Sequence, residues 1–373
     1  MPSPTVLFAL LGDVTGSSRA LRQIRALVGM GLRVEIVQVG PPRRPEAVPE
    51  AASLTALSRP DGGGPAFFWA AHRAVRAEVR ARTASLYLAS DLYVLPALAE
   101  AARRHGGRLV YDSRELYAAL DSSAGRPLVS AVWRAVERRY IGRADAVLTV
   151  GDAIADRLGA TYGIPRPTVL YNAPEPSPEA VDPEALRRTL GLPDDGRLVV
   201  LYQGLFRVGR GLPALVEAAG AVEEVRLALI GEGDVEPDVR RLGAGLGDRL
   251  VVHPFVPPDA LARLTPGADL GACLIEPLTE SLRLSLPNKL FEYLAAGVPV
   301  LASPLPEIRR AASGAGVFAD PQDPEAVADA LRTALDPATR AAWAAHSRDA
   351  LDPYTWTAGR EAFRRLILDL LPT

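Results

Sequence analysis

Residues 285–300 read SLPNKLFEYLAAGVPV, and the order of residue types in this stretch predicts one repeating unit of a parallel α/β fold. Pro287 suits the first turn of a helix, and Ser285 or Leu286 can act as its N-cap. Apolar residues then recur at helical spacing along one face. Gly297 is placed to end the helix at the C′ position, and the VPVLA that follows predicts a strand.

The same alternation of apolar strands with amphipathic helices runs along the whole chain, which is typical of layered α/β proteins. Residues 40–66 are rich in proline and glycine and are expected to form a loop, while YNAPEPSPEAVDPEA, from residue 171, has the composition of a linker. Two βα arrays joined by a linker predict two lobes, with a ligand site in the cleft between the carboxyl ends of both sheets. The expected strands are 6–10, 33–39, 85–89, 108–111 and 146–150 before the linker, and 198–202, 226–230, 250–253, 270–275 and 298–302 after it.

The composition excludes several classes of protein. The 373 residues are 48% hydrophobic with a formal net charge of −2, so no overall basic field predicts nucleic-acid binding. The single cysteine, Cys273, rules out disulfides within the chain and thiolate zinc sites, and the four histidines lack ligand spacing. We expect no metal and no cofactor. The N-terminal apolar run lacks a basic segment before it, and no apolar run approaches the ~20 residues of a membrane span. We therefore expect a soluble cytoplasmic protein.

Lys289 is the only lysine in the chain, because Lys and Arg total 42 and 42 − 1 = 41 of them are arginine. It falls in the first turn of the predicted helix, where a cation is unfavourable for the helix itself but suits an arriving anion. Pro287 and Asn288 belong to the same helix tip. Glu292, three residues on, is placed to accept hydrogen bonds from ribose hydroxyls if a phosphate binds at the tip. The alternatives are an exposed Lys289–Glu292 pair of little energetic consequence and a lysine retained by codon drift.

Eight segments resemble, in order, those of family 4 glycosyltransferases, and the resemblance covers most of the chain. PNKLFEYLAAGVPVLAS is similar to the nucleotide-sugar-binding segment of that family, LVYDSREL to its YDxHE segment, and LYNAPEP to its interdomain asparagine segment. The eight segments span residues 6–37, 109–116, 144–158, 170–176, 199–218, 227–234, 287–303 and 354–371.

This resemblance implies the GT-B fold, with two Rossmann-like parallel-sheet lobes facing across a cleft. Residues 1–172 would form the acceptor-side lobe, together with a C-terminal helix (355–373) that crosses back to it, and residues 173–354 the nucleotide-sugar lobe. The family transfers a sugar from a nucleotide diphosphate donor to an acceptor hydroxyl, with retention and without a required metal. The acceptor would be a saccharide, a lipid-linked molecule or a small molecule, and surface polysaccharide or glycoconjugate biosynthesis is the expected setting.

The resemblance also implies roles for single residues. Glu292 would bind the donor ribose and Arg210 the pyrophosphate, with Lys289 as a second cation that stabilises the charge developing on the leaving group. Arg210 could act as a bidentate fork and Lys289 as a compact point charge, in a pocket that fits an ammonium but not a guanidinium. The remaining donor-binding candidates are Pro287, Asn288, Gly204, Arg207, the first-lobe loop residue Gly16, and Gly231 and Gly233, which would keep a turn open near the base.

Three positions depart from the family pattern. Leu284 stands where many members have a second glutamate eight positions before the ribose-binding one, and Leu205 replaces the arginine that usually follows Gly204, with Arg207 two residues later. Arg114 replaces the histidine of YDxHE. We expect it to contact phosphate or acceptor, the alternative being an ion pair with Asp112 or Glu115. These departures leave open two other functions, a non-catalytic nucleotide-sugar-binding partner subunit and an epimerase of the same fold.

Two predicted helices of the first lobe combine arginines with apolar residues, FFWAAHRAVRAEVRARTA from residue 67 and VSAVWRAVERRYIGR from residue 129. One interpretation is peripheral contact with the inner face of an anionic membrane, where a lipid-linked acceptor would lie. The other is a solvated helix face in an arginine-rich chain, with Trp133 either in the core or as an anchor.

Overall fold

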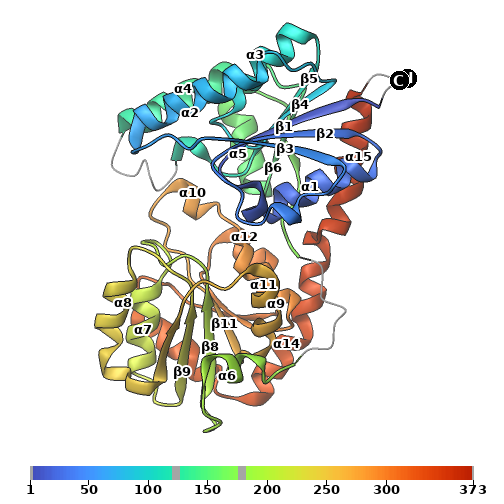
Figure 1. Ribbon diagram of the computed structural model, residues 1–373. Helices are drawn as coiled ribbons and strands as arrows, with labels where there is room; N and C mark the ends of the chain where they lie inside the picture. The colour runs from blue at the N-terminus through green and yellow to red at the C-terminus, as the bar shows by residue number, and fades with distance from the viewer. Residues whose placement is uncertain (1–2, 120–126, 175–181, 372–373) are drawn as a thin grey trace. The chain divides into compact units, whose positions relative to one another are not determined.

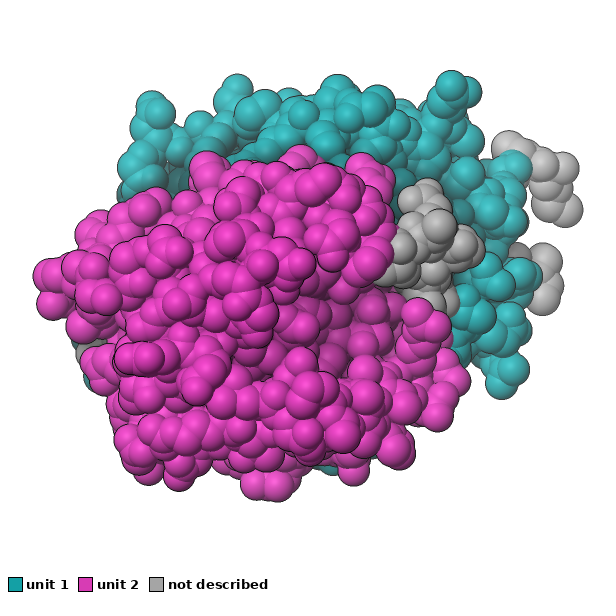
Figure 2. Space-filling view, turned by 90° about the horizontal axis from the view of Figure 1, so that it is seen from below, with its two compact units in different colours: residues 1–172, 356–373 teal, residues 173–355 magenta. Residues whose placement is uncertain are grey.

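The computed structural model describes residues 3–119, 127–174 and 182–371. It divides into two compact units, which Figure 2 shows in separate colours. Unit 1 contains Met1–Asn172 and Trp356–Thr373, and unit 2 contains Ala173–Thr355. Part of the expected linker, residues 175–181, lies outside the described residues. Each unit is an α/β layer structure in its own right.

Unit 1 is built on a parallel sheet that, in the described residues, has seven strands in the order β3-β2-β1-β4-β5-β6-β7. Helices α2, α3 and α4 cover one face of this sheet, and α1 and α15 lie together on the other (Figure 1). The elements are β1 (Thr5–Leu11), η1 (Val14–Gly16), α1 (Ser18–Gly29), β2 (Arg33–Val39), η2 (Pro45–Ala47), β3 (Ala52–Leu57), α2 (Gly64–Val79), β4 (Leu86–Ala89), α3 (Leu95–His105), β5 (Arg108–Ser113), η3 (Tyr117–Ala119), α4 (Pro127–Ile141), β6 (Ala146–Thr149), α5 (Asp152–Tyr162), β7 (Thr168–Val169) and α15 (Trp356–Leu370).

Unit 2 repeats the architecture with a parallel sheet that, in its described part, has six strands in the order β10-β9-β8-β11-β12-β13. Its elements are α6 (Ala185–Leu190), β8 (Leu198–Gln203), α7 (Leu212–Gly220), β9 (Val225–Ile230), α8 (Glu236–Leu242), η5 (Gly243–Arg249), β10 (Leu250–His253), α9 (Pro258–Leu264), η6 (Thr265–Gly267), β11 (Leu270–Cys273), α10 (Glu280–Arg283), α11 (Asn288–Ala295), β12 (Val300–Ala302), α12 (Pro306–Ala311), β13 (Gly316–Phe318), α13 (Pro324–Thr333), α14 (Pro337–Leu351) and η7 (Asp352–Tyr354).

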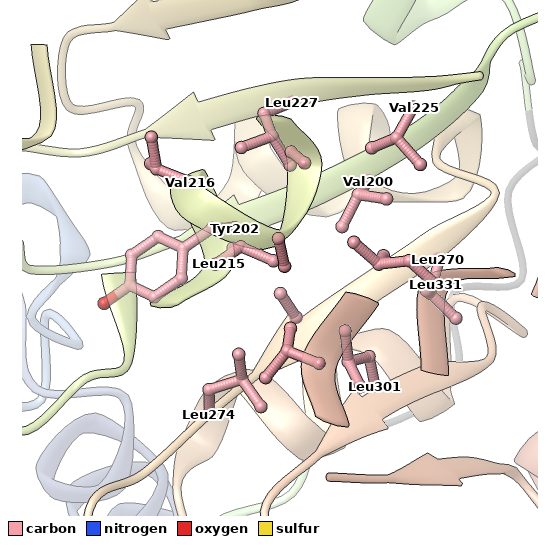
Figure 3. Close-up of a cluster of buried hydrophobic side chains, with 14 of the residues drawn as sticks. Val200, Tyr202, Leu215, Val216, Val225, Leu227, Leu270, Leu274, Leu301 and Leu331 are labelled. Carbon is pink, nitrogen blue, oxygen red and sulfur yellow. The ribbon is translucent and has the colours of Figure 1, made fainter. Parts of the chain in front are cut away.

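The core of unit 2 explains why its central strands are apolar throughout rather than alternating. Every residue of β8 and β9 is buried, because helices cover both faces of the sheet. On one face, Leu215 of α7 and Leu331 of α13 pack with Val200 and Leu227 of the strands (Figure 3). Burial of this kind contributes about 25 cal/mol per Å² of apolar surface, so this cluster is a main source of the stability of the unit.

All ten strands expected from the sequence are present, but the expectation of a loop over 40–66 was wrong in part. Ala52–Leu57 forms β3, paired in parallel with β2 from Val34 to Val39 at the edge of the sheet. The flanking prolines and glycines obscured this six-residue strand. The very short strands β7 and β13, of 2 and 3 residues, were also missed, since their pattern is too short to distinguish from a loop.

The last helix returns to the first lobe, as expected. The chain enters and leaves unit 2 at adjacent points, where Ala173 and Thr355 form a parallel bridge. Helix α15 then contacts α1, and Phe363 and Ile367, both fully buried, join the core of unit 1. The final helix therefore completes the hydrophobic core of unit 1, and the other residues of that core come from the N-terminal 172 residues.

This packing predicts different costs for two adjacent positions on α15. Ile367→Ala should lower the free energy of unfolding by about 2–5 kcal/mol, because it removes buried methylene groups and leaves a cavity. Leu368, 53% exposed, is the matched control, and Leu368→Ala should change stability by less than about 0.5 kcal/mol. Calorimetric unfolding of the full chain measures both. Equal effects at the two positions would show that α15 does not pack as described.

Candidate functional site

The strand order of unit 2 reverses between β8 and β11, and in open α/β sheets ligands bind beyond the carboxyl ends of the strands at such a switch point. Gln203 ends β8 and Cys273 ends β11. Helix α11 contacts β11 and β12, so its first residues belong to this edge of the sheet. The structure thus places the stretch that holds the only lysine at the position where the topology predicts a ligand.

Tyr293 fixes α11 to the sheet. Its hydroxyl donates to the carbonyl oxygen of Leu201 at 3.0 Å and accepts from the amide of Gln203 at 3.1 Å. The ring lies over Gly271 of β11, where a Cβ would stand 2.3 Å from a ring carbon, so only glycine allows this approach. A fully buried tyrosine that satisfies its hydroxyl on the neighbouring strand sets the position of the whole helix.

Helix α11 begins later than the sequence suggested. Its N-cap is Pro287, without a side-chain capping bond, so neither Ser285 nor Leu286 acts as the cap. The physical reason is that Ser285 belongs to the end of α10, where its amide and hydroxyl both donate to the carbonyl oxygen of Leu282. Gly297, with φ +72°, follows the C-cap Ala296 as expected. The positive end of the helix dipole lies at the exposed Asn288.

Lys289 points back over the sheet edge. Its Nζ lies 3.4 Å from the centre of the Tyr202 ring, and a Cβ on Gly204, which has φ +120°, would stand 3.7 Å from that nitrogen. Burial lowers the pKa of Lys289 to about 7, and the positive charge of nearby Arg210 acts in the same direction. The ring face favours the ammonium and offsets part of this cost. Lys289 and Glu292 are both half-buried, so the two residues do not form the exposed pair that was the alternative interpretation.

Glu292 is part of a polar network on the same helix. Its carboxylate accepts a short hydrogen bond from the Nε2 of Gln203. The Oε1 of Gln203 in turn accepts from the hydroxyl of Thr265 at 3.0 Å. The network holds the carboxylate at the carboxyl end of β8, one turn along the helix from Lys289. An oriented carboxylate of this kind is suited to accept hydrogen bonds from hydroxyl groups.

Arg210 lies in a loop that Glu276 holds in place. The amide of Gly211 donates to a carboxylate oxygen of Glu276 at 3.1 Å, and the amide of Glu276 donates to the carbonyl oxygen of Gly209 at 3.1 Å. Glu276 thus fixes the loop on both sides of Arg210. No pattern in the sequence predicted this positioning role for Glu276.

Gly231 and Gly233 allow two loops of unit 2 to pack closely. A Cβ on Gly231 would stand 1.9 Å from the carbonyl oxygen of Gly204, and one on Gly233 would stand 2.2 Å from that of Phe206. Both glycines therefore let the turn after β9 approach the loop after β8. They shape the loop that carries Arg210, and proximity to a base stays a prediction.

The structure also describes Leu205 and Leu284, two of the positions that depart from the family pattern. Leu205 is 48% exposed and Arg207 is exposed in the same loop. Leu284 is the half-buried C-cap of α10. Leu205 carries no charge, but a Cβ on the preceding residue, Gly204, would stand 3.7 Å from the Nζ of Lys289. Lys289 is thus placed close to where that arginine would begin.

In unit 1 the strand order reverses between β1 and β4, and a second charged group lies at that switch point. Asp91, 1% exposed, accepts from the amides of Leu11 (2.6 Å), Tyr93 (2.9 Å) and Val94 (3.1 Å). Arg114 lies 3.7 Å from this carboxylate. Burial raises the pKa of Asp91, and Arg114 opposes that shift.

Arg114 therefore pairs with Asp91, and not with Asp112 as one form of the alternative interpretation had it. Asp112 is committed to Arg19 of α1, which donates to both carboxylate oxygens at 2.8 and 2.7 Å, in a pair that is almost fully buried. The charge of Asp91, at the end of the neighbouring strand, was not included in the sequence argument. The sequence did hold a signal for Asp91, because it is a polar residue just after an apolar strand. The same signal applies to Gln203.

Gly16 ends the short helix η1 and is exposed. Its φ is not positive, and the nearest atom to a Cβ there would be a carboxylate oxygen of Asp13 at 3.8 Å, so turn geometry does not require glycine at this position. The glycine with positive φ in this loop is Gly12, at +120°. Gly16 thus offers an open backbone surface, and its approach to a phosphate stays a prediction.

Among the described residues, no group of three or more histidine, cysteine, aspartate or glutamate side chains is placed to hold a metal ion.

Two protein families match successive parts of the chain. The family described as "Glycosyl transferase 4-like domain" matches residues 15–174, and the family described as "Glycosyl transferases group 1" matches residues 197–337. The matches fall on unit 1 and unit 2 respectively. A comparison with curated proteins finds no significant match.

Many solved structures share the fold over the full chain. A sucrose-phosphate synthase from Thermosynechococcus elongatus has a TM-score of 0.80 at 18% identity, covering 98% of both chains. HepE from Anabaena, solved with UDP, has a TM-score of 0.76 at 16% identity, covering 98% of this chain and 100% of that one. A glycosyltransferase from Rickettsia africae has a TM-score of 0.75 at 13% identity, covering 99% of each. At these identities the likeness shows the fold, which is GT-B.

The half-buried position of Lys289 predicts a pH-dependent stability. Its pKa is about 7 in the folded chain and near 10.5 when unfolded, so the unfolded chain binds more protons between these values and stability rises with pH there. Lys289→Met should therefore raise the free energy of unfolding by roughly 1–3 kcal/mol at pH 6, with a smaller gain at pH 10. Denaturant unfolding of both proteins at pH 6, 8 and 10 measures the difference. A gain that does not change with pH would contradict the burial of a charged group.

Proposed function

This chain belongs to the group 1 glycosyltransferases, and from that premise we propose that it transfers a sugar from a nucleotide diphosphate sugar to an acceptor hydroxyl, with retention and without a required metal. The observation that carries the proposal is the convergence of Arg210, Lys289 and Glu292 at the switch point of unit 2. Two cations beside a helix N-terminus suit a diphosphate, and an oriented carboxylate one turn further suits a ribose.

The leaving group of the reaction is a nucleoside diphosphate, so catalysis rests on stabilising the negative charge that develops on it. Arg210 donates to the phosphate oxygens as a planar fork in a loop that Glu276 holds rigid. Lys289 supplies a compact ammonium from the ring face of Tyr202, and the N-terminus of α11, at Pro287 and Asn288, faces the same anion. The arrival of the diphosphate raises the pKa of Lys289 and restores its charge.

The other predicted residues have supporting roles in this proposal. Gly204 and Arg207 border the donor in the loop after β8, and Gly231 and Gly233 let the next turn close against that loop. Gly16, in a loop of unit 1, stays a predicted contact of the donor phosphates. Arg114, fixed beside Asp91, acts on the acceptor side, where it binds a phosphate or orients the acceptor. HepE was solved with UDP and with UDP-glucose, which makes UDP and UDP-glucose the first probes to use.

Substitutions at the switch point test the donor site. Arg210→Ala, Lys289→Ala and Glu292→Ala should each weaken binding of the nucleotide diphosphate by about 10- to 100-fold, the usual cost of losing a charge-assisted hydrogen bond. Lys289→Arg should also lose affinity, because the ammonium is seated on the Tyr202 ring, and the longer side chain with its planar guanidinium would have to leave that position.

Titration calorimetry with the UDP, GDP or ADP species that gives the largest thermal shift measures these affinities. Arg263→Ala, an exposed arginine on α9, is the matched control and should bind as the wild type does. Wild-type affinity in both Lys289→Ala and Glu292→Ala would refute the site. Wild-type activity in Lys289→Arg would show that the lysine has no special fit.

Donor binding should depend on pH through Lys289. UDP-glucose has no phosphate group that titrates near pH 7, so its affinity isolates the protein side. If the bound diphosphate keeps Lys289 charged, affinity falls about tenfold from pH 6 to pH 8, because above pH 7 binding must include uptake of a proton. Lys289→Met should remove this pH dependence. If the wild type binds UDP-glucose with the same affinity from pH 6 to pH 8, Lys289 does not become a neutral amine in the free protein over this range.

Turnover separates the proposal from a non-catalytic partner subunit and from an epimerase. Incubation of the purified chain with a bound nucleotide sugar should release the nucleoside diphosphate, by transfer or slow hydrolysis, and EDTA should leave the rate unchanged. A nucleotide sugar that binds but never turns over would favour the partner subunit. Recovery of an epimerised nucleotide sugar would favour the epimerase.

A further inference from the structure

We propose that the donor of this enzyme carries a deoxyhexose, in which a methyl group replaces the C6 hydroxymethyl group of a common hexose. This assignment rests on the proposed function and deepens it, since it concerns the sugar that the same donor site takes. The feature that carries it is a group of apolar side chains beside Arg210, formed by Val208, Leu278 and Leu282, which we call the apolar wall.

Unit 2 exposes large apolar side chains only at its functional edge. Among its described residues these side chains are Leu205, Val208, Phe255 and Leu278. All four lie in the loops that follow β8, β10 and β11, at the carboxyl edge of the sheet. In unit 1 the exposed large apolar side chains lie on helices instead, and no described helix of the chain is long and apolar enough to cross a membrane. Apolar groups gathered at a ligand edge indicate a ligand with an apolar part.

The apolar wall is continuous across two loops. A Cβ on Gly209 would stand 2.9 Å from the Cδ1 of Leu282 and 3.4 Å from the Cδ1 of Leu278, so both leucine side chains cover the backbone next to Val208. The amide of Glu276 donates to the carbonyl oxygen of Gly209 at 3.1 Å and joins the loops. Leu282 is buried, whereas Val208 is 70% and Leu278 48% exposed. The wall therefore presents apolar surface from the loop after β8 and from the loop after β11.

The wall lies on the sugar side of the proposed diphosphate site. The diphosphate binds there at the N-terminus of α11, with Arg210 and Lys289, and the ribose binds at Glu292, one turn further along the helix. A nucleotide sugar joins ribose, two phosphates and sugar in that order, so the sugar extends from the phosphates away from Glu292. The residues on that side precede α11 or flank Arg210, and the wall is among them. Phe255 follows β10, two strands from β8, and is not part of the wall.

The segment that leads into α11 is rich in leucine. Residues 278–287 read LTESLRLSLP. The hydroxyl of Thr279 accepts from the amide of Leu282 at 3.2 Å, and the hydroxyl of Ser285 donates to the carbonyl oxygen of Leu282 at 2.8 Å, so both hydroxyls are engaged within the segment. The carboxylate of Glu280, half-buried on α10, is suited to accept from ring hydroxyls. The segment thus combines an acceptor for the ring with an apolar surface for a methyl group.

A methyl group and a hydroxymethyl group differ in what they lose at such a surface. The hydroxyl gives up hydrogen bonds to water, and an apolar surface offers none in return. The methyl group has no such loss and gains free energy by leaving water. A hexose with a C6 hydroxyl against the wall should therefore bind about 10- to 100-fold more weakly than its 6-deoxy form.

Other occupants of the wall fit less well. A stable interface with a second copy of the chain buries about 800 Å² on each partner, far more than two exposed side chains supply. An apolar group of the acceptor would also match the wall, but it would have no effect on donor binding measured without acceptor. The donor alone therefore decides between these occupants.

Three UDP-sugars that differ only at C5 test the assignment by titration calorimetry without acceptor. UDP-glucose carries a hydroxymethyl group at C5, UDP-xylose a hydrogen and UDP-6-deoxyglucose a methyl group. The methyl compound should bind about fourfold more tightly than UDP-xylose, the effect of one buried methylene group, and about 10- to 100-fold more tightly than UDP-glucose. If the site prefers another base, the glucose or mannose derivative of that base is compared with its 6-deoxy form.

Substitutions in the wall test whether it is the source of the preference. Val208→Thr/Leu278→Gln introduces hydrogen-bonding groups with little change in volume and should bring the affinities for UDP-glucose and UDP-6-deoxyglucose to within about threefold of each other. The ratio of the two affinities cancels any effect on the nucleotide part. Leu368→Gln, at a similarly exposed leucine on α15, is the matched control and should keep the wild-type ratio. Thermal unfolding checks that each variant folds.

Equal affinities of the wild type for UDP-glucose and UDP-6-deoxyglucose, or tighter binding of UDP-glucose, would overturn the assignment and leave the proposed function intact. A preference for the methyl compound that Val208→Thr/Leu278→Gln leaves unchanged would also overturn it, as would a dimer seen by sedimentation that this variant abolishes. If no nucleotide sugar binds at all, the proposed function fails together with the assignment.

Discussion

The contact between Tyr293 and the centre of the unit 2 sheet is the constraint on which the candidate site depends. The ring covers Gly271, and the hydroxyl bridges Leu201 and Gln203 of β8, so α11 cannot slide or rotate without leaving buried polar groups unpaired. Lys289, one turn before Tyr293, and Glu292, directly before it, inherit their positions from that contact. The packing of Tyr293, rather than their own interactions, therefore sets where the charges of Lys289 and Glu292 lie.

The cationic part of the site is kept at a cost to stability. Lys289 is placed where burial lowers its pKa, while Arg210 adds a like charge nearby. Nothing in the free chain compensates fully for this, and the ring of Tyr202 does so only in part. Such a cost is typical of sites prepared for a ligand of opposite charge. By contrast, the buried pair of Arg19 and Asp112 in unit 1 is complete in itself and links α1 to β5.

The sequence predicted the features whose evidence lies within one short segment of the chain, and it missed those that depend on segments far apart. The ten apolar runs and the helix over residues 288–295 carried their own periodicity, and β10 and β2 were placed to the residue. The edge strand β3 was missed because its proline- and glycine-rich flanks outweighed six residues of weak alternation. The alternative interpretation of Arg114 considered only acids close to it in sequence, whereas Asp91, with which it pairs, lies 23 residues away at the end of the neighbouring strand.

The sequence by itself determined the alternation of strands and helices, the division into two arrays and the residues whose types suit a diphosphate, because each is written in local periodicity and side-chain chemistry. Only the tertiary structure decided that Gln203 orients Glu292, that Glu276 holds the loop of Arg210, and that Lys289 rests on Tyr202. The cited contacts join residues between 65 and 89 positions apart in the sequence. Their pairing follows from strand order and burial, which no local pattern encodes.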